Sequence, residues 1–480
     1  MMVRGVAWRA LVVVMLGSGA AAAKTITVTN GAELGAAIAA AQPGDVVELA
    51  DGTYDSTGYS CQTSGTAQAP ITVRAKNARG ATVRFDALEG FKISGDHWHF
   101  EGLVVRGVCA VDDNCEHAFH VTGASGFVMR GCAAIDFNAQ LKVNAVPPKL
   151  PNGGLVEGNE IYDTRPRNTA NPTTKLNVDS GDDWVLRGNV IHDFQKGGGD
   201  NVSYGAFLKC GGQRGVMERN LVLCARDFTG GTRIGLSLGG GGCAPQFCEP
   251  AFNANVPCVE HTDGIVRNNI IAGCSDVGVY VNQGKNSRVD YNTLIATSGI
   301  DFRFAMTTGE ARGNVLAGAI RNRDGATGAF ANNLENVAQA TFDGLYVAPL
   351  AGDLRKKGDL STLIGKGMSV PVVTDDYCAR ARAAPFDLGA LQHSLGDCVT
   401  TQPDAGAGDG GSSGDAAGGS DASGAGDGGG GGGGGAGGCS CDTSGDDAGW
   451  SLAGLASVLA VLALRRGRAP RRLVGRRDPP

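Results

Sequence analysis

The chain has 480 residues, 77 of them glycine, and a formal net charge of −6. Glycine at about 16% is roughly twice its usual share and disfavours a helical bundle. The glycines show no three-residue period, which excludes collagen, and an apolar content of 42% excludes a wholly disordered chain. Because the net charge gives no basic field, no nucleic-acid partner is expected.

Residues 1–23 have the order of parts of a secretory signal peptide. Arg4 and Arg9 give a positive start, residues 10–16 are apolar, and small residues at 21–23 offer a cleavage site. The alternative is an ordinary buried helix. Export to the cell surface or outer membrane is therefore expected.

The body that follows repeats short β-rich phrases, each with a marked asparagine at the same place. Each phrase holds alternating Val and Ile residues, with Gly and Asn where turns are expected, and no helical stretch separates the strands. A unit of about 22 residues with loop insertions is typical of a solenoid and predicts a parallel β-helix. The asparagines are expected to be structural, at turns or stacked in a ladder: Asn159, Asn189, Asn220, Asn269, Asn292, Asn314 and Asn333.

The start of the body predicts a cap for this solenoid. We expect a strand over 25–29, a helix over 32–41, a Pro-Gly-Asp turn at 43–45 and a strand over 46–50, followed by Asp-Gly-Thr-Tyr. Together with a Phe-Asp-Leu-Gly-Ala phrase at 386–390, this order resembles the proteins related to chondroitinase B and alginate lyases. The resemblance spans about 25–392. It implies an all-β, right-handed parallel β-helix over 24–398 with a short N-terminal capping helix, expected to be a monomer.

Twelve cysteines lie between Cys61 and Cys398, and in an exported chain an even number indicates disulfides. A zinc site is the competing interpretation, but no paired CxxC motif is present. Cys224, Cys258 and Cys274 surround the longest insertion, and their connectivity stays open. Local spacing predicts three pairs: Cys109–Cys115, Cys243–Cys248 and Cys378–Cys398.

One face of the predicted coil carries polar side chains that stand between two apolar neighbours. Because alternate strand residues point to opposite faces, these polar side chains are expected to point outward. Four such residues are His120, Lys142, Asn177 and Lys209. Each of them except Lys142 lies 11 or 12 residues before the marked position of its phrase, which predicts one outward column on successive strands. Tyr280 and Arg303 are expected on later strands. Such a column predicts a shallow groove that binds an extended polysaccharide or cell-surface glycan.

The resemblance implies a uronate polysaccharide lyase in which a lysine on such a strand is the base and calcium neutralises the substrate carboxylate. It assigns the base to Lys209 and a calcium ligand to Asn177. Two family glutamates are absent, and the family's catalytic arginine falls at Gly239, with Arg233 six residues away on the same strand. Asp179, Asp182, Asp183 and Asp200 could also hold a cation, and Asp179 and Asp200 are the candidates chosen with Asn177.

Two histidine pairs are weaker candidates for a metal site. His97 and His99 share one face of a strand and are expected to be a surface pair. His117 and His120 lie close in sequence beside Glu116, but the sequence identifies no third ligand.

The C-terminal end is expected to lie outside the fold. A Gly/Ser/Asp-rich stretch over 399–448 predicts a disordered linker, 449–464 is an apolar transmembrane or sorting helix, and 465–480 is a basic cytoplasmic tail. From about 437 to 472, the order of small residues, cysteine, apolar span and arginine cluster resembles the MYXO-CTERM sorting tail of myxobacterial surface proteins. The resemblance implies removal of the apolar helix and surface attachment through a modified Cys439. A plain membrane anchor is the alternative.

Two hypotheses about function follow from these features. The first is a surface-anchored protein that binds or acts on an extended polysaccharide, as a degenerate uronate lyase or a glycan binder. The second is a non-catalytic adhesin or spacer, because the tail tethers the chain and the family's arginine is absent at its expected position.

Overall fold

The computed structural model describes residues 23–240, 242–249, 252 and 258–399. The predicted signal peptide, linker, sorting helix, basic tail and Cys439 therefore lie outside the described residues, apart from Ala23 and Val399. The described residues belong to one compact unit. Across the described ranges, no helix has the length and apolar character needed to cross a membrane.

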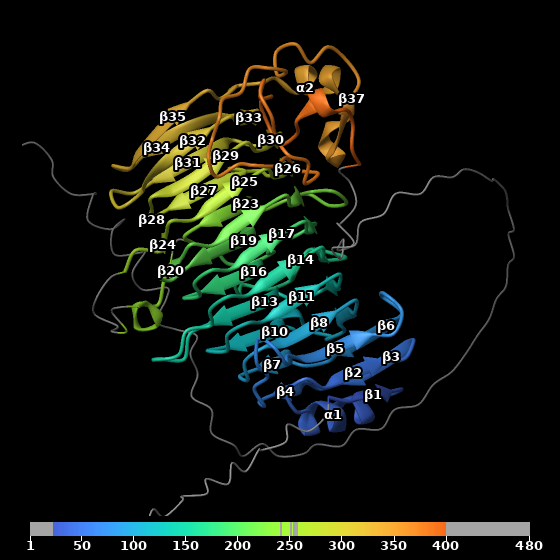
Figure 1. Cartoon of the computed structure of the whole chain (residues 1–480). Helices are drawn as coiled ribbons and strands as arrows, with labels where there is room; N and C mark the ends of the chain where they lie inside the picture. Colours follow the sequence, from blue (N-terminus) through green and yellow to red (C-terminus); the bar gives the residue numbers. More distant parts are fainter. Residues whose placement is uncertain (1–22, 241, 250–251, 253–257, 400–480) are drawn as a thin grey trace, which may run out of the picture. The chain divides into compact units, whose positions relative to one another are not determined.

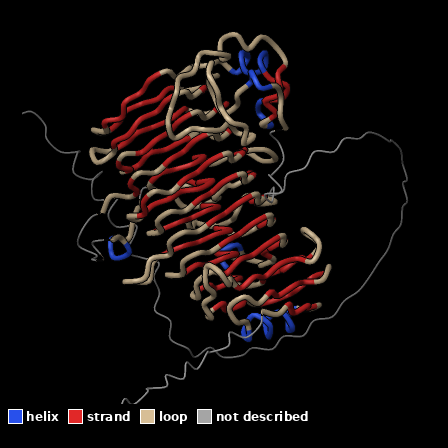
Figure 2. Tube along the Cα trace, in the orientation of Figure 1, coloured by secondary structure: helices blue, strands red, loops and turns tan. Residues whose placement is uncertain are grey.

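Three parallel sheets, A, B and C, form the walls of a coil in which the chain visits each sheet in turn (Figures 1 and 2). Sheet A contains β1 (Thr25–Val28), β2 (Val46–Leu49), β5 (Ile71–Ala75), β8 (Trp98–Glu101), β11 (Val128–Arg130), β14 (Leu155–Glu157), β17 (Val185–Arg187), β21 (Val216–Glu218), β25 (Ile265–Arg267), β29 (Ser287–Asp290), β32 (Thr308–Arg312) and β35 (Thr327–Ala331). Sheet B contains β3 (Gly52–Ser56), β6 (Ala81–Phe85), β9 (Val104–Gly107), β12 (Ala133–Ile135), β15 (Glu160–Tyr162), β18 (Val190–His192), β22 (Leu221–Leu223), β26 (Ile270–Ala272), β30 (Thr293–Ile295) and β33 (Val315–Leu316). Sheet C contains β4 (Tyr59–Cys61), β7 (Glu89–Ile93), β10 (His117–Thr122), β13 (Ala139–Asn144), β16 (Thr173–Asp179), β19 (Val202–Lys209), β23 (Thr232–Leu238), β27 (Val279–Asn282), β31 (Gly299–Arg303) and β34 (Ala319–Arg323).

The predicted parallel β-helix is confirmed by this arrangement; its right-handed sense stays a prediction. Alternate apolar side chains from the three walls, such as Val156, Ile161 and Leu176, point inward and are fully buried in one core. A short sheet of β20 (Gly212–Gln213), β24 (His261–Thr262) and β28 (Gly284–Lys285) lies at one corner.

The marked asparagines form a buried ladder that runs along the coil. The side-chain and backbone nitrogens of Asn189 donate to Oδ1 of Asn220 at 3.0 and 3.1 Å, and Asn220 makes the same contacts with Asn269. The pattern continues from Asn159 to Asn333. A ladder of this kind satisfies buried backbone groups at the turn that follows sheet A.

Helix α1 (Gly31–Ala40) closes the N-terminal end of the coil. Asn30 is its N-cap and accepts a hydrogen bond from the Glu33 backbone nitrogen at 2.9 Å, while Glu33 accepts from Thr29 in return. Leu34 and Ile38 face the core. The helix therefore covers apolar side chains that an open solenoid end would expose.

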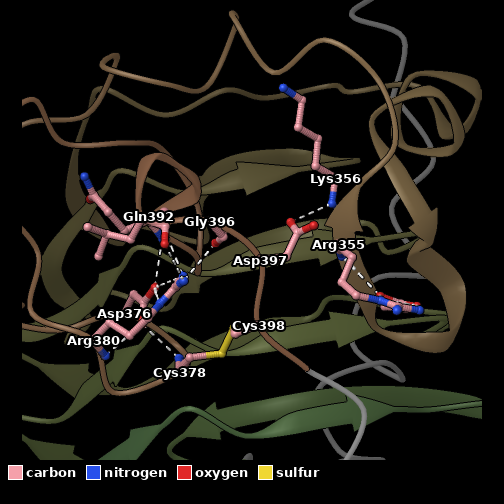
Figure 3. Close-up of a disulfide and its surroundings, with 11 residues drawn as sticks. Arg355, Lys356, Asp376, Cys378, Arg380, Gln392, Gly396, Asp397 and Cys398 are labelled. Carbon is pink, nitrogen blue, oxygen red and sulfur yellow. Dashed lines mark hydrogen bonds and ion pairs between the residues drawn. A yellow bond between two sulfur atoms is a disulfide. The ribbon is translucent and has the colours of Figure 1, made fainter. Parts of the chain in front are cut away.

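The coil ends at β35, and the chain then packs against the outer face of sheet B. Helix α2 (Gln339–Leu345) and the antiparallel pair β36 (Tyr346–Ala348) and β37 (Asp353–Lys356) share a hydrophobic cluster with Leu221 and Ile270. Figure 3 shows the end of this segment, where Cys378 is bonded to Cys398 and Arg380 binds Asp376. Short 3₁₀ turns occupy Asp112–Asn114, Pro245–Phe247, Pro349–Ala351 and His393–Leu395.

The observed disulfides show that one of the three expected pairings is wrong. Cys109 is bonded to Cys115, and Cys378 to Cys398, but Cys243 is bonded to Cys210 and not to Cys248, which pairs with Cys258. The physical reason is that the long insertion after β23 folds back onto the end of β19, where Cys210 lies. Cys224 and Cys274 form the remaining bond in the described residues.

Candidate functional site

The outer face of sheet C carries the predicted polar column, in a different register from the expected one. His120 pairs with Lys142, and Lys142 with Asn177, as expected. Asn177 then pairs with Phe207, so Lys209 lies opposite Asp179, two residues further along the strand. The turn from β19 to β21 is one residue longer than the turn from β16 to β17, which accounts for one residue of this shift. The other arises because Lys209 lies 11 residues before its marked asparagine, whereas Asn177 lies 12 before its own.

The shifted register brings Lys142, Asp179 and Lys209 together, and we call these three residues the lysine cluster. Lys142 Nζ lies 2.5 Å from Asp179 Oδ2 and donates to Asn177 Oδ1 at 3.1 Å. Lys209 Nζ lies 3.8 Å from Asp179 Oδ1. One carboxylate thus sits between two ammonium groups that belong to strands two positions apart.

A glycine-rich segment after β23 packs over Lys209. The Lys209 ammonium donates to the carbonyl of Gly242 at 2.7 Å and lies 4.6 Å from the centre of the Phe207 ring. Glu260, which is 2% exposed, accepts hydrogen bonds from the backbone nitrogens of Gly240 and Gly242 at 3.4 and 3.2 Å. Glu260 therefore anchors the segment that contacts Lys209.

Burial shifts the pKa values of Lys142 and Glu260 in opposite directions. It lowers the pKa of Lys142, aided by the charge of Lys209 and opposed by Asp179. It also raises the pKa of the Glu260 carboxyl, opposed by Lys209. Shifts of this kind, in buried groups close to other charges, make Lys142 and Glu260 candidate functional-site residues.

The other predicted site residues lie elsewhere. Arg233 is buried at the opposite end of its strand, where it binds Gln195 at 2.6 Å and two backbone carbonyls, so it does not meet Lys209. Asp200 lies before β19 and forms an ion pair with Lys196. Arg303 donates to the Tyr280 hydroxyl at 3.2 Å, further along sheet C.

The predicted calcium ligands do not fit a calcium ion in this arrangement. Calcium takes six to eight oxygen ligands. Asn177 Oδ1 and Asp179 Oδ2 both contact the Lys142 ammonium. Asp200 contributes nothing because it precedes β19, at the opposite end of that strand from Lys209. The lysine ammonium occupies the position between these two oxygens that a cation would take.

His120 lies beside Lys142 but belongs to a second group of side chains. His120 Nδ1 is 2.6 Å from Glu89 Oε1, and Nε2 is 2.8 Å from Asn144 Oδ1. His117 Nδ1 lies 3.6 Å from the same Glu89 oxygen. Burial lowers the pKa of His117 to about 4.

Sequence reasoning missed Glu260 and Glu89. Glu260 follows a cysteine-rich insertion whose path back to β19 depends on the Cys210–Cys243 bond, and no pattern in the sequence signals it. Glu89 could have been found, because aligning β7 with β10 places it directly opposite His117.

Comparisons with known proteins agree with the fold. The family model described as chondroitinase B matches residues 28–140. No curated protein matches the chain. Among solved structures, pectate lyase Pel9A aligns with a TM-score of 0.54 and 16% identity, covering 78% of this chain and 97% of its own. An alginate lyase from Paenibacillus sp. str. FPU-7 aligns with a TM-score of 0.41 and 14% identity, covering 64% and 99%. The chain thus has a parallel β-helix fold like that of a polysaccharide lyase.

Proposed function

We propose that this protein binds an extended acidic polysaccharide along the outer face of sheet C and acts on it at the lysine cluster. The observation that carries the proposal is the placement of Lys142 and Lys209 on either side of Asp179. Their two positive charges flank one carboxylate, and the net positive charge of the cluster suits a polymer that carries carboxylates. The similarity of the fold to that of pectate lyase supports the same substrate class.

The cluster has the groups that β-elimination from a uronate requires. Burial lowers the pKa of the Lys142 ammonium, so this group gives up its proton more readily than a free lysine, and the resulting amine can take the proton from the carbon next to the carboxylate. The Lys209 ammonium can pair with that carboxylate and stabilise the charge that develops. The glycosidic C–O bond then breaks, and the proton carried by Lys142 passes to the leaving oxygen.

An absorbance assay for unsaturated uronides tests this proposal. The purified full-length protein is incubated with alginate, pectate and chondroitin, with and without calcium, which also tests the predicted calcium requirement. We expect turnover on one of these polymers. Lys142→Ala should abolish kcat, whereas Lys209→Ala should mainly raise KM. Lys76→Ala, at an exposed corner between sheets A and B, is the matched control. Absence of product from all three polymers would count against the lyase reaction.

A non-catalytic surface adhesin or spacer is the second candidate. It is favoured by the register, which places Gly239 beside Lys209 and keeps Arg233 at the far end of β23. It predicts that no polymer is cleaved and that Lys209→Ala changes no turnover. Any turnover that depends on Lys209 would exclude it.

Export and attachment to the cell surface are part of the same proposal. They rest on the predicted signal peptide at 1–23 and the sorting-tail resemblance around Cys439. Cell fractionation tests them: the wild-type protein is expected at the surface, and a Cys439→Ser variant is expected in the medium or the inner membrane. Retention of that variant at the surface would argue for a plain membrane anchor.

A further inference from the structure

A second polar group lies beside the lysine cluster on the first strands of sheet C. Glu89, His117 and His120 each present one ligand atom, and these atoms lie within 4.8 Å of one another. We call them the histidine cluster. Glu89 lies on β7 directly opposite His117 on β10, so the parallel register holds the three side chains together.

The hydrogen bonds around His120 fix which ring nitrogen carries the proton. Asn144 Nδ2 donates to the Ala145 carbonyl at 3.1 Å, so its Oδ1 is the atom that faces His120. An amide oxygen only accepts, so His120 Nε2 must donate. In the neutral imidazole, Nδ1 then carries a lone pair that points at Glu89 Oε1 from 2.6 Å.

Two lone pairs at this distance repel each other, so either a second proton on His120, which then donates to Glu89, or a metal cation must lie between them. His117 adds a third atom that could bind a cation, because its Nδ1 is buried and has no hydrogen-bond partner. The distance of 3.6 Å from that atom to Glu89 Oε1 is too long for a hydrogen bond. A cation shared by the three atoms would satisfy both histidines at once.

We propose that Glu89, His117 and His120 bind a divalent transition-metal ion, with zinc as the best match. Two imidazole nitrogens and one carboxylate oxygen form a ligand set that zinc prefers and calcium does not. Tetrahedral zinc places its ligand atoms about 3.3 Å apart, given bonds of about 2.0–2.1 Å. The separation of 3.6 Å between His117 and Glu89 is close to that value, and a small rotation of the His120 ring widens the 2.6 Å contact.

Neighbouring groups orient these ligands. Asn144 holds the His120 tautomer, and Lys92 Nζ lies 3.2 Å from Glu89 Oε2, which leaves Oε1 for the metal. Three protein ligands leave a fourth position for water or for an anionic group of a bound ligand. The site adjoins Lys142 on the next strand, but it does not depend on lyase activity.

Zinc titration of the tag-free, unreduced full-length protein tests the proposal. After dialysis against a chelator, calorimetry is expected to show a zinc site that Glu89→Gln and His120→Gln each weaken at least tenfold. His99→Gln, on sheet A, is the control and should leave the affinity unchanged. Equal zinc affinity in the wild type and both cluster variants would overturn the assignment, as would displacement of the zinc by excess calcium.

Anomalous X-ray scattering from wild-type crystals soaked in zinc chloride gives a readout that needs no variant. A peak at the zinc edge between the Nδ1 atoms of His117 and His120 is the expected result. Density at the zinc edge only elsewhere in the molecule, or none, would overturn the proposal even if a variant failed to fold.

Discussion

Asp179 lies opposite Lys209 in the parallel register of β16 and β19, and its second carboxylate oxygen binds Lys142 from β13. A single carboxylate therefore couples two lysines that the chain separates by 67 positions. Because Asp179 is mostly buried, its charge is weakly screened and holds both ammonium groups in place.

Replacing Asp179 with asparagine should destabilise the fold. The substitution keeps the shape but leaves two ammonium groups near each other on a mostly buried face. We expect a loss of about 2–4 kcal/mol in the free energy of unfolding, measured by urea denaturation. Asp324→Asn is the control: this exposed carboxylate pairs with Arg303, and because solvent screens exposed ion pairs its loss should have a much smaller effect. Equal costs for the two variants would contradict the assigned role of Asp179.

Removing one asparagine of the ladder should be similarly costly. In Asn220→Ala, the backbone and side-chain nitrogens of Asn189 and the Oδ1 of Asn269 all lose a partner while fully buried. We expect about 2–4 kcal/mol of destabilisation by chemical denaturation. Asn77→Ala, which removes one exposed hydrogen bond to Asp51, should cost less than about 1 kcal/mol. A ladder variant as stable as this control would show that the asparagines are not structural.

The two unpaired cysteines of the described residues should be unreactive in the folded protein. Cys61 and Cys132 are buried, and burial raises the pKa of the Cys132 thiol to about 12. At neutral pH this cysteine is a thiol, and the thiolate is the reactive species. Mass spectrometry should therefore find iodoacetamide on both residues only after unfolding. Rapid labelling of either residue in the native protein would contradict their placement in the core.

His192 should make stability depend on pH. Burial opposes its protonation, but hydrogen bonds to Asp193 and Glu160 outweigh burial and raise its pKa. The stability that this raised pKa contributes is fully present below the unfolded value of about 6.5 and is lost as pH rises through the folded pKa. The difference in unfolding free energy between wild type and His192→Gln should thus be larger at about pH 5.5 than at about pH 8.5. A difference that grows with pH would contradict the raised pKa.

The fold could be predicted from the sequence because the local signals repeat. Each phrase carries its own strand alternation, turn glycine and marked asparagine, so a wrong assignment in one phrase does not change the fold predicted from the others. The capping helix was predicted within one residue at each end, because Asn30 and Glu33 form a local N-cap.

The site could be predicted only in part, because it depends on contacts between strands far apart in the chain. The direction of Lys142 and Lys209 follows from strand parity, but the pairing of Lys209 with Asp179 depends on the length of a turn. Glu260 anchors the segment that contacts Lys209, and it follows a long insertion held by a disulfide whose pairing local spacing did not reveal. Arg233 has the parity of an outward residue, yet it is buried against Gln195.

The most direct test of the central claim is the affinity of an acidic oligouronate for the wild type and for Lys142→Ala, Lys209→Ala and Lys76→Ala, measured by calorimetry. If the lysine cluster is the binding site, both cluster variants should bind at least tenfold more weakly, about 1.4 kcal/mol, while Lys76→Ala binds like the wild type. Binding by the wild type that both cluster variants retain in full would contradict the account.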